Sequence, residues 1–338
     1  MTERRRFIVK AGGAAATTVA AATIINVLSV IAQPKVQWRM STTWTPALDL
    51  LQGKAQRLAK IVEETSGGRF RIEVFPGGQI MQPFECFDAA SKGMIEAFMG
   101  APYYWTAKES AVEWFATIPF GMNPQGMTAW LYQGDGLKLM EETHGTFNLV
   151  PRPGGSVPPQ MAGAGGTAVL IPGAEIFAAL ERGVIDAAEW STPHDDMKLG
   201  LHKTARYYYY PGWQEPATIN DFGFNKNSYD ALPVDLRQTL DHAAAAVHVY
   251  GVADFHTKNA IALERLKTEF KGKVEILPLP SPVLRDLKKL ATEVIKEESE
   301  KTPMARKVHA SFTKFQTLVG PWDRVAEGAY HQFVGGTT

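Results

Sequence analysis

Strand-like and helical segments alternate over residues 36–101, and this alternation limits the possible folds more than any other feature of the sequence. Two segments alternate polar and apolar side chains, as strands with one buried face do, and a third is an apolar run. The β-α-β-α-β order predicts an α/β domain with a largely parallel sheet. The predicted elements are a strand over 36–42, a helix that opens at Thr45-Pro46 and closes at Gly67-Gly68, a strand over 69–75, a helix over 84–93 and a strand over 94–101.

The longest predicted element is a helix that starts at Leu232-Pro233 and ends near Lys271. At the rise of an α-helix it spans roughly 55 Å, which exceeds one compact domain. We therefore expect it to run along two lobes or into a partner. Residues 151–166 are rich in proline and glycine and are predicted to link the lobes. The other predicted elements are helices over 126–142, 174–182 and 283–300, the last with Leu287, Leu290 and Val294 facing inward, and strands over 184–189, 218–225 and 274–279.

Charge and cysteine content exclude several classes of function. Lysine plus arginine and aspartate plus glutamate both number 35, so the formal net charge is zero. A nucleic-acid partner would require a basic face, so none is expected. The single cysteine, Cys86, excludes an internal disulfide, and no cluster of cysteine and histidine has the spacing of a structural zinc site.

Residues 1–32 carry the features of a twin-arginine signal peptide. Residues 3–10 read ERRRFIVK, in which two arginines and one spacer precede Phe and Ile. A moderately apolar run follows over 11–32, as in a signal peptide. The run is also long enough to span a membrane, so an uncleaved anchor is the alternative. With a loose small-residue cleavage site at 30–32, we expect a mature chain that starts near Gln33 and works in the periplasm.

The stretch from Gly183 to Pro216 concentrates acidic and aromatic residues that no single strand or helix requires. It contains the pair Glu189-Trp190, the pair Asp195-Asp196, the run Tyr207 to Tyr210 and the turn PGWQEP. Rigid aromatic rings beside carboxylates suit a small polar ligand, with or without a cation. Ligands of α/β sheets bind outside the carboxyl ends of strands, which is where Glu189 and Trp190 are predicted to lie.

Several of these residues also have a purely structural explanation. Tyr103 and Tyr104 follow the strand over 94–101, and either line a pocket mouth or pack under a loop. Asp195 and Asp196 are favoured as caps of the helix predicted to follow them. Neighbouring tyrosines of one strand point to opposite faces, so at least two of the four in the tyrosine run are expected to serve packing.

Seven segments together resemble one family. The chain resembles the extracytoplasmic solute-binding proteins of tripartite ATP-independent periplasmic (TRAP) transporters, and it is most similar to the branch that binds 2-oxo and 2-hydroxy monocarboxylates such as pyruvate and lactate. The similarity runs from about Val36 to the end of the chain. The segments are VQWRMSTTW at the start of the mature chain, FPGGQI at 75–80, AFMGAPYYWTAK at 97–108, Gln160-Met161, LIPGAEIFAAL at 170–180, GVIDAAEW at 183–190 and YYYYPGWQEP at 207–216.

The resemblance implies a two-lobed periplasmic binding protein of the α/β class, with a long helix that crosses the lobes and a ligand held between them. It also implies that a sodium or calcium ion lies beside the substrate. Matched residue by residue, the cation ligands are Gln160, Glu189 and the backbone carbonyl of Trp190, with Glu215 as a further candidate. Oxygen donors of this kind suit hard cations. The residues implied for substrate binding are Tyr103, Tyr104, Ser156, Gln160, Trp190 and Trp213, where Ser156 replaces the usual asparagine.

One departure from the family pattern affects the site. Relatives carry a longer segment between the glutamine-methionine pair and LIPG, and it holds an arginine that binds the substrate carboxylate. Here the chain has an internal deletion near 163–165, and that arginine is missing. Arg152 and Arg182 are the nearest replacements in sequence, and neither has a matching context. Two hypotheses follow: the chain is a weakened or inactive relative, or it binds through the cation alone. In either case we expect lower stability than in full-length relatives.

The resemblance implies a non-enzymatic protein that delivers a small carboxylate to TRAP membrane permease subunits, and a homodimer is possible. A ligand-sensing periplasmic module is the alternative. A metal-dependent enzyme is the least favoured, because the sequence has no Ser/His/Asp set, HExxH or Gly-rich phosphate loop. The expected division is a signal peptide over 1–32, lobe 1 over 33–152 plus 223–250, a shortened lobe 2 over 153–222 plus 251–285, and C-terminal helices over 286–338.

Overall fold

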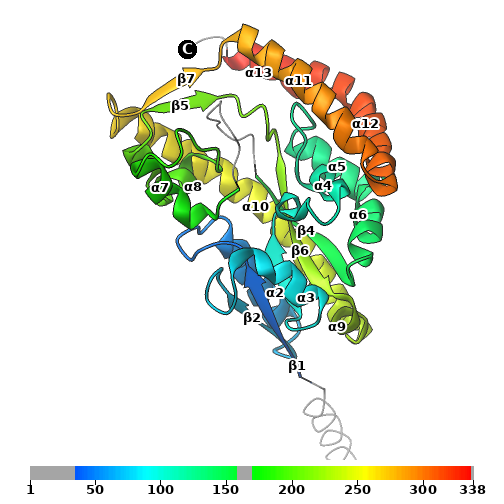
Figure 1. Cartoon of the computed structure of the whole chain (residues 1–338). Helices are drawn as coiled ribbons and strands as arrows, with labels where there is room; N and C mark the ends of the chain where they lie inside the picture. The colour runs from blue at the N-terminus through cyan, green and yellow to red at the C-terminus, as the bar shows by residue number, and fades with distance from the viewer. Residues whose placement is uncertain (1–34, 158–169, 336–338) are drawn as a thin grey trace, which may run out of the picture.

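The computed structural model describes residues 35–157 and 170–335, and a five-stranded sheet forms the centre of its larger lobe (Figure 1). The strand order is β2-β1-β3-β6-β4. β1 pairs in parallel with β2 and β3, whereas β6 runs antiparallel to both β3 and β4. The predicted α/β class is confirmed, and the sheet is mixed rather than largely parallel. The strands are β1 (Val36–Thr42), β2 (Phe70–Phe75), β3 (Ala97–Gly100), β4 (Leu149–Val157) and β6 (Thr218–Asn225).

β4 lies within part of the segment predicted to be a linker, so that prediction is wrong for 151–157. Pro151 and Pro153 pair with Gly223 and Asp221 of β6. Proline cannot donate a backbone hydrogen bond, and it is tolerated here because β4 is the last of the described strands of the sheet. The remainder of the predicted linker lies outside the described residues.

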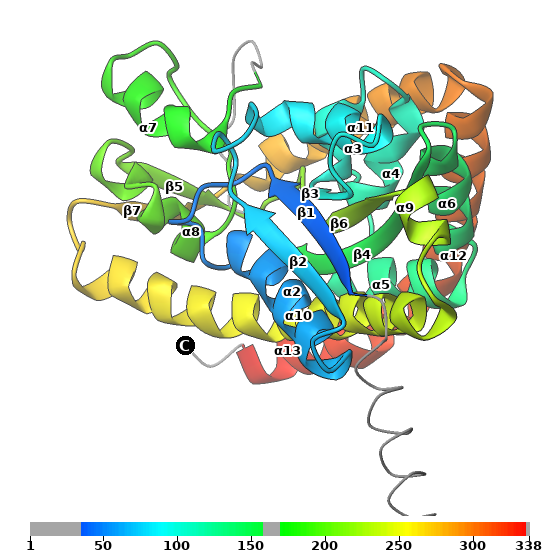
Figure 2. The same ribbon diagram turned by 90° about the horizontal axis from the view of Figure 1, so that it is seen from below.

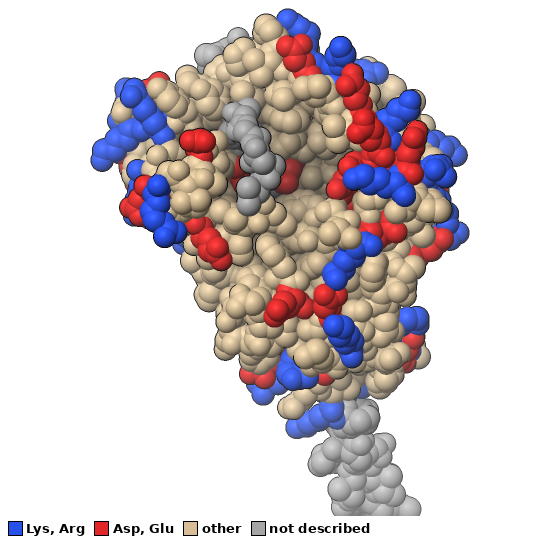
Figure 3. Space-filling view, viewed as in Figure 1, with Lys and Arg blue, Asp and Glu red and all other residues tan. Residues whose placement is uncertain are grey.

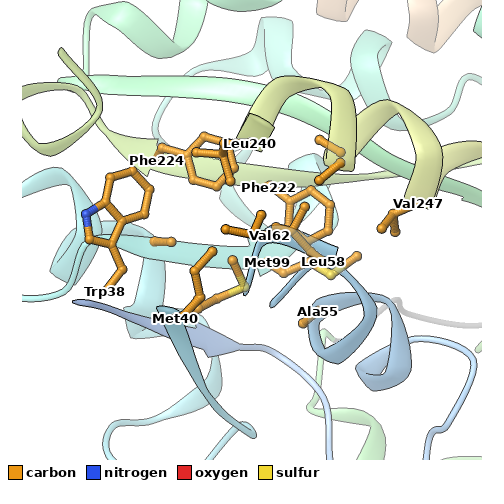
Figure 4. Packing of buried hydrophobic residues seen from close by; sticks show 14 of the residues in the cluster. Trp38, Met40, Ala55, Leu58, Val62, Met99, Phe222, Phe224, Leu240 and Val247 are labelled. Carbon is orange, nitrogen blue, oxygen red and sulfur yellow. The ribbon is translucent and has the colours of Figure 1, made fainter. Parts of the chain in front are cut away.

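Two helices, α2 (Gln52–Thr65) and α10 (Val234–Thr268), cover one face of this sheet. Leu58 and Val62 of α2 and Leu240 and Val247 of α10 pack with Phe222 of β6, and all five are fully buried (Figure 4). Burial of each such side chain contributes roughly 1.5–3 kcal/mol. Helix α2 begins at Gln52 and not at the predicted Thr45, because residues 45–51 form successive turns.

The helices α3, α4, α5 and α6 pack on the opposite face, and α4, α5 and α6 share a second apolar core with the C-terminal helix α12. The single helix predicted over 126–142 is divided in two. Helix α5 ends at Gln133, and Gly134 caps it with an extended backbone. The helices and short 3₁₀ turns of this lobe are η1 (Pro83–Glu85), α3 (Cys86–Ser91), η2 (Pro102–Trp105), η3 (Ser110–Val112), α4 (Glu113–Ala116), α5 (Pro124–Gln133), α6 (Gly136–Gly145) and α9 (Lys226–Asp230).

The smaller lobe contains a two-stranded parallel sheet, β5 (Tyr207–Tyr210) and β7 (Glu275–Pro278), with α7 (Gly173–Glu181), α8 (Pro193–Lys198) and η4 (Leu201–Lys203) beside it. The strand predicted over 184–189 is wrong. Residues 186–190 make no backbone–backbone hydrogen bond with any other described residue, so the segment has no strand to pair with.

Helix α10 connects the two lobes. It is 35 residues long, it packs on α2 and β4 of the larger lobe, and it also contacts α8 of the smaller one. Seen from below, it runs beneath both sheets (Figure 2). The predicted long helix that crosses the lobes is therefore confirmed, and Gly251 lies inside it without ending it.

The C-terminal part is an arch of helices over the larger lobe (Figure 1). It comprises α11 (Ser281–Glu300), α12 (Pro303–Asp323), a π-helical turn (Arg324–Gly328) and α13 (Ala329–Gly335). The prediction that Leu290 and Val294 face inward is wrong, because both are more than half exposed. The buried residues of that helix are Ala291 and Ser299, and Ala291 lies one position away from the predicted face. Over residues 35–157 and 170–335, no helix has the length and apolar character of a membrane span.

Candidate ligand site

The segment that carries Glu189 and Trp190 connects α7 to α8 of the smaller lobe, and the Trp190 indole reaches across the space between the lobes to pack against the core of the larger one. The segment is held from behind by Gly173, the first residue of α7, because a methyl group at that position would lie 2.3 Å from an indole carbon of Trp190. The glycine of the LIPG segment is therefore required for the indole to pack against the backbone of α7. The indole nitrogen of Trp190 is buried and has no hydrogen-bond partner among the described residues.

Glu215 approaches the same space from the larger lobe, just before β6. Its Oε2 accepts a hydrogen bond of 2.8 Å from the Thr218 hydroxyl, and the side chain is buried. Burial raises the pKa of the Glu215 carboxyl to about 7, against the opposing effect of the hydroxyl groups of Thr218 and Tyr103. Glu215 is thus poised between its neutral and charged forms near neutral pH.

Glu189 lies close enough to Glu215 for the two carboxyl groups to repel each other. Burial, and then the charge of Glu215, raises the pKa of Glu189 well above its usual value, and the nearby Gln214 amide only partly offsets this. Glu189 Oε1 is buried without a hydrogen-bond partner, and no ion pair among the described residues includes either glutamate. Two buried carboxyl groups without a cation are an arrangement that a bound metal ion would relieve.

Tyr103 and Tyr104 form one wall beside these acids. Their rings pack edge to face with centroids 5.0 Å apart. The pKa of the Tyr103 hydroxyl is raised by burial, then by the charges of Glu215, Tyr104 and Glu189. Tyr104 has the same two glutamates among its charged neighbours. Both tyrosines therefore lie near the two acids, and Tyr104 also packs on Phe84 with ring centroids 4.9 Å apart, so the pocket-lining role stays a prediction.

For the other residues implied by the resemblance, no hydrogen bond with Glu189 or Glu215 is seen in the described part of the chain. Ser156 is fully buried on β4, one residue from the partner of Thr218, and its hydroxyl lies 3.5 Å from the Val157 carbonyl oxygen. The Trp213 ring stacks on Phe120 of the larger lobe, with centroids 5.5 Å apart. Gln160 and the predicted deletion near 163–165 lie outside the described residues. The molecular face is hollowed between the lobes, and acidic side chains are visible inside the hollow (Figure 3).

Neither arginine considered as a replacement for the missing one lies at this site. Arg152 binds Asp241 at 2.8 Å and Glu141 at 2.6 Å, on the flank of the larger lobe. Arg182 is exposed at the end of α7 and donates to the Ala178 carbonyl oxygen at 3.0 Å. Neither arginine lies in a stretch that matches the family pattern, so their absence from the site agrees with their sequence context.

Asp196 supports the site through its hydrogen bonds and not through the predicted helix cap. Helix α8 starts at Pro193, so Asp195 and Asp196 lie in its first turn and do not cap it, which makes the capping prediction wrong. Asp196 accepts from the Ser191 backbone N–H at 3.2 Å and from the Tyr208 hydroxyl. It thereby fixes the residue that follows Trp190. The spacing of Ser191 and Asp196 was visible in the sequence, whereas the contact with Tyr208 of β5 was not.

Comparison with known proteins places this arrangement in a family. The sequence profile of the bacterial extracellular solute-binding proteins, family 7, matches residues 40–149 and 156–302. The chain belongs to this family. It is a TRAP transporter solute-binding protein, and the predicted identity is confirmed. Proteins of this family are periplasmic transport components and not enzymes, as predicted.

Individual relatives support the assignment. The chain is 33% identical over 341 aligned residues to a monocarboxylate 2-oxoacid-binding periplasmic protein of Nostoc sp., with 92% of this chain and 93% of the relative covered. A TRAP solute-binding protein of Bordetella bronchiseptica, described as a mixed-occupancy dimer with calcium and picolinate, has a TM-score of 0.85 at 30% identity, with 90% and 98% covered. One of Pseudoalteromonas atlantica, with sodium and pyruvate, has a TM-score of 0.83 at 31% identity, with 88% and 98% covered. These similarities confirm the two-lobed fold.

Proposed function

We propose that this TRAP solute-binding protein captures a small 2-oxo or 2-hydroxy monocarboxylate, such as pyruvate or lactate, together with a sodium or calcium ion. The observation that supports this most strongly is the pair Glu189 and Glu215: burial and the charge of Glu215 raise the pKa of the Glu189 carboxyl, and no ion pair among the described residues includes either glutamate. Related proteins that contain sodium or calcium with pyruvate support the same ligand pair.

The charges explain why a cation and an acid would bind together. A substrate carboxylate brought next to two ionised glutamates would be repelled, whereas a hard cation is attracted to carboxylate and carbonyl oxygens. Glu189, Glu215, the backbone carbonyl of Trp190 and Gln160 would hold the ion. The ion would neutralise the glutamates and supply a positive charge for the substrate carboxylate.

Aromatic side chains would limit the size of the substrate. Tyr103 and Tyr104 would form one wall, and Trp190 and Trp213 would cover the apolar end of the acid. Ser156 would contribute a hydroxyl near the carboxyl end of β4. In the absence of the family arginine, the cation would be the main anchor of the substrate carboxylate.

A calorimetric titration of metal-free protein tests this proposal. Pyruvate, lactate and longer 2-oxo acids are titrated with and without sodium or calcium. We expect binding of at least one acid that requires a cation and that is lost in Glu189→Ala. Absence of binding under every condition would favour the alternative, a non-binding relative disabled by the deletion near 163–165. Binding restored after insertion of the family segment would then identify the deletion as the cause.

We further propose export through the twin-arginine signal over 1–32, delivery of the acid to TRAP membrane permease subunits, and assembly as a homodimer. Leu318, Trp322 and Val325 of the C-terminal helices follow one another at helical spacing and are each about 70% exposed, which is the pattern of a helix that packs on a partner. The proposed lobe limits at 152/153 and 222/223 fall within β4 and β6.

A further inference from the structure

A compact group of charges joins the larger lobe to α8, and the proposed function does not use it. Asp49 lies in the turns before α2, between the buried side chains of Leu48 and Leu50. These leucines fix the turn in the core of the larger lobe. The Asp49 carboxylate therefore projects from a rigid base toward the smaller lobe.

Asp49 contacts positive or protonatable groups from two other elements. Its Oδ1 lies 2.8 Å from His194 Nε2 on α8, and its Oδ2 lies 2.7 Å from Lys258 Nζ on α10. Lys198, at the other end of α8, lies 3.7 Å away. The His194 backbone N–H also donates to Asn259 Oδ1 of α10 at 2.9 Å. One carboxylate thus ties the start of α8 to the long helix and to the larger lobe.

A second, buried pair of ionisable groups, Asp195 and Lys54, lies next to the first group. Asp195 is fully buried, and its carboxyl group lies within 4.8 Å of the ligand atoms of Asp49 and His194. Lys54 of α2 is its nearest opposite charge, and the Lys54 amine donates to Asn220 Oδ1 at 2.7 Å. Burial raises the pKa of Asp195 and lowers that of Lys54, to about 7 in each case. This arrangement of donors also resembles a metal site. However, Lys198 and Lys258 already neutralise Asp49, so the ion-pair network explains the charges without a metal.

The position of the network relative to the ligand site gives it a role. Helix α8 begins at Pro193, three residues after Trp190 and four after Glu189. We propose that Asp49 is a positioning residue for ligand capture: through His194 and Lys258 it holds the start of α8, and with it Glu189 and Trp190, against the larger lobe. The proposal rests on the proposed function for its ligand, and Asp49 is not among the residues proposed to touch that ligand.

The contacts of Asp49 would affect ligand binding by stabilising the arrangement of the two lobes seen in this structure. A contact made only when the lobes are in this arrangement increases its population, and the apparent affinity for ligand rises by the same factor. Removal of the Asp49 charge is expected to weaken ligand binding by about threefold to tenfold. The loss should appear as faster dissociation, because the contacts of the ligand itself are unchanged.

The test compares Asp49→Asn with Asp235→Asn. Asp235 is a matched control, because it is an exposed aspartate that pairs with Arg69 at the far end of α10 from the smaller lobe. Pyruvate affinity is measured with calcium present at low and high salt, and hydrogen exchange is measured on residues 191–199 of ligand-free protein. We expect weaker, less salt-dependent binding and faster exchange only in Asp49→Asn, and recovery in Asp49→Glu.

The two proposals fail in different ways. If the wild-type protein binds no acid, the proposed function fails, while hydrogen exchange still tests Asp49. If Asp49→Asn matches Asp235→Asn in affinity, salt dependence and exchange, the positioning role is refuted. A zinc titration that reveals a tight site lost in Asp49→Asn would show a metal centre in place of the ion-pair network and would also overturn the proposal.

Discussion

Replacement of Glu215 by glutamine is predicted to stabilise the cation-free protein while abolishing its cation binding. The carboxyl group has a pKa of about 7 in the folded protein against an ordinary value of 4.5. A pKa raised in the folded state means that the folded protein holds the proton more tightly than the unfolded chain. Stability is therefore highest below the unfolded pKa and falls as the pH rises toward 7.

The size of this effect follows from the pKa difference. A rise of the Glu215 pKa from 4.5 in the unfolded chain to about 7 in the folded protein corresponds to roughly 3 kcal/mol of stability that is lost above pH 7. Glutamine carries no charge and can still accept a hydrogen bond from Thr218. Glu215→Gln should therefore raise the free energy of unfolding by about 1–3 kcal/mol at pH 8 and change it little at pH 4.5.

Urea denaturation of chelator-treated protein at pH 4.5 and pH 8 measures this difference, with Glu264→Gln, an exposed position on α10, as the control. Calcium should stabilise the wild-type protein at pH 8 and leave Glu215→Gln unchanged. A variant that is less stable than wild type at pH 8 without calcium would refute the reasoning, because it would show that the ionised carboxyl group is already compensated within the chain.

Three further predictions follow from the fold. Gly173→Ala should displace the Trp190 indole and weaken pyruvate binding about tenfold or more in calorimetry. The control Gly145→Ala, where a methyl group meets no atom within 4 Å, should leave the affinity unchanged. Equal affinities of the two variants would contradict the packing argument. Trp322→Glu should convert a dimer to a monomer in light scattering while Lys314→Glu leaves it intact, and a wild-type monomer would exclude the proposed assembly. Calorimetry should give a thermal midpoint below that of full-length relatives, and a cooperative melt above about 60 °C would argue against the expected effect of the deletion.

The local sequence pattern was sufficient to place a helix or strand where that element buries one face against the sheet or a neighbouring helix. The strands β1 and β2 and the helix α10 lie close to their predicted positions, because alternation and helical spacing follow directly from burial on one side. The prediction failed for 184–189, whose residues are spaced like a strand but have no described neighbour to pair with. It also failed for Leu290 and Val294, because apolar spacing alone does not reveal which side of a helix faces the core.

The site was predictable only in part, for a similar reason. Glu189, Glu215 and the tyrosine pair were predicted from their chemistry and the family resemblance; in the structure these groups lie close enough to shift one another's pKa values, and their roles in binding stay predictions. The support given by Gly173 to Trp190 and by Tyr208 to Asp196 joins residues that are separate in the sequence. Such contacts depend on how α7, α8 and β5 pack against one another, which no local pattern specifies.

The central claim is that the cation and the carboxylate occupy one shared site, and the calcium affinity of metal-free protein tests it most directly when measured with and without saturating pyruvate. Thermodynamic linkage requires pyruvate to strengthen calcium binding by the same factor by which calcium strengthens pyruvate binding. The account predicts equal factors well above one in the wild-type protein and no calcium binding in Glu189→Ala. Calcium binding that is indifferent to pyruvate, or pyruvate binding that is indifferent to calcium, would contradict it.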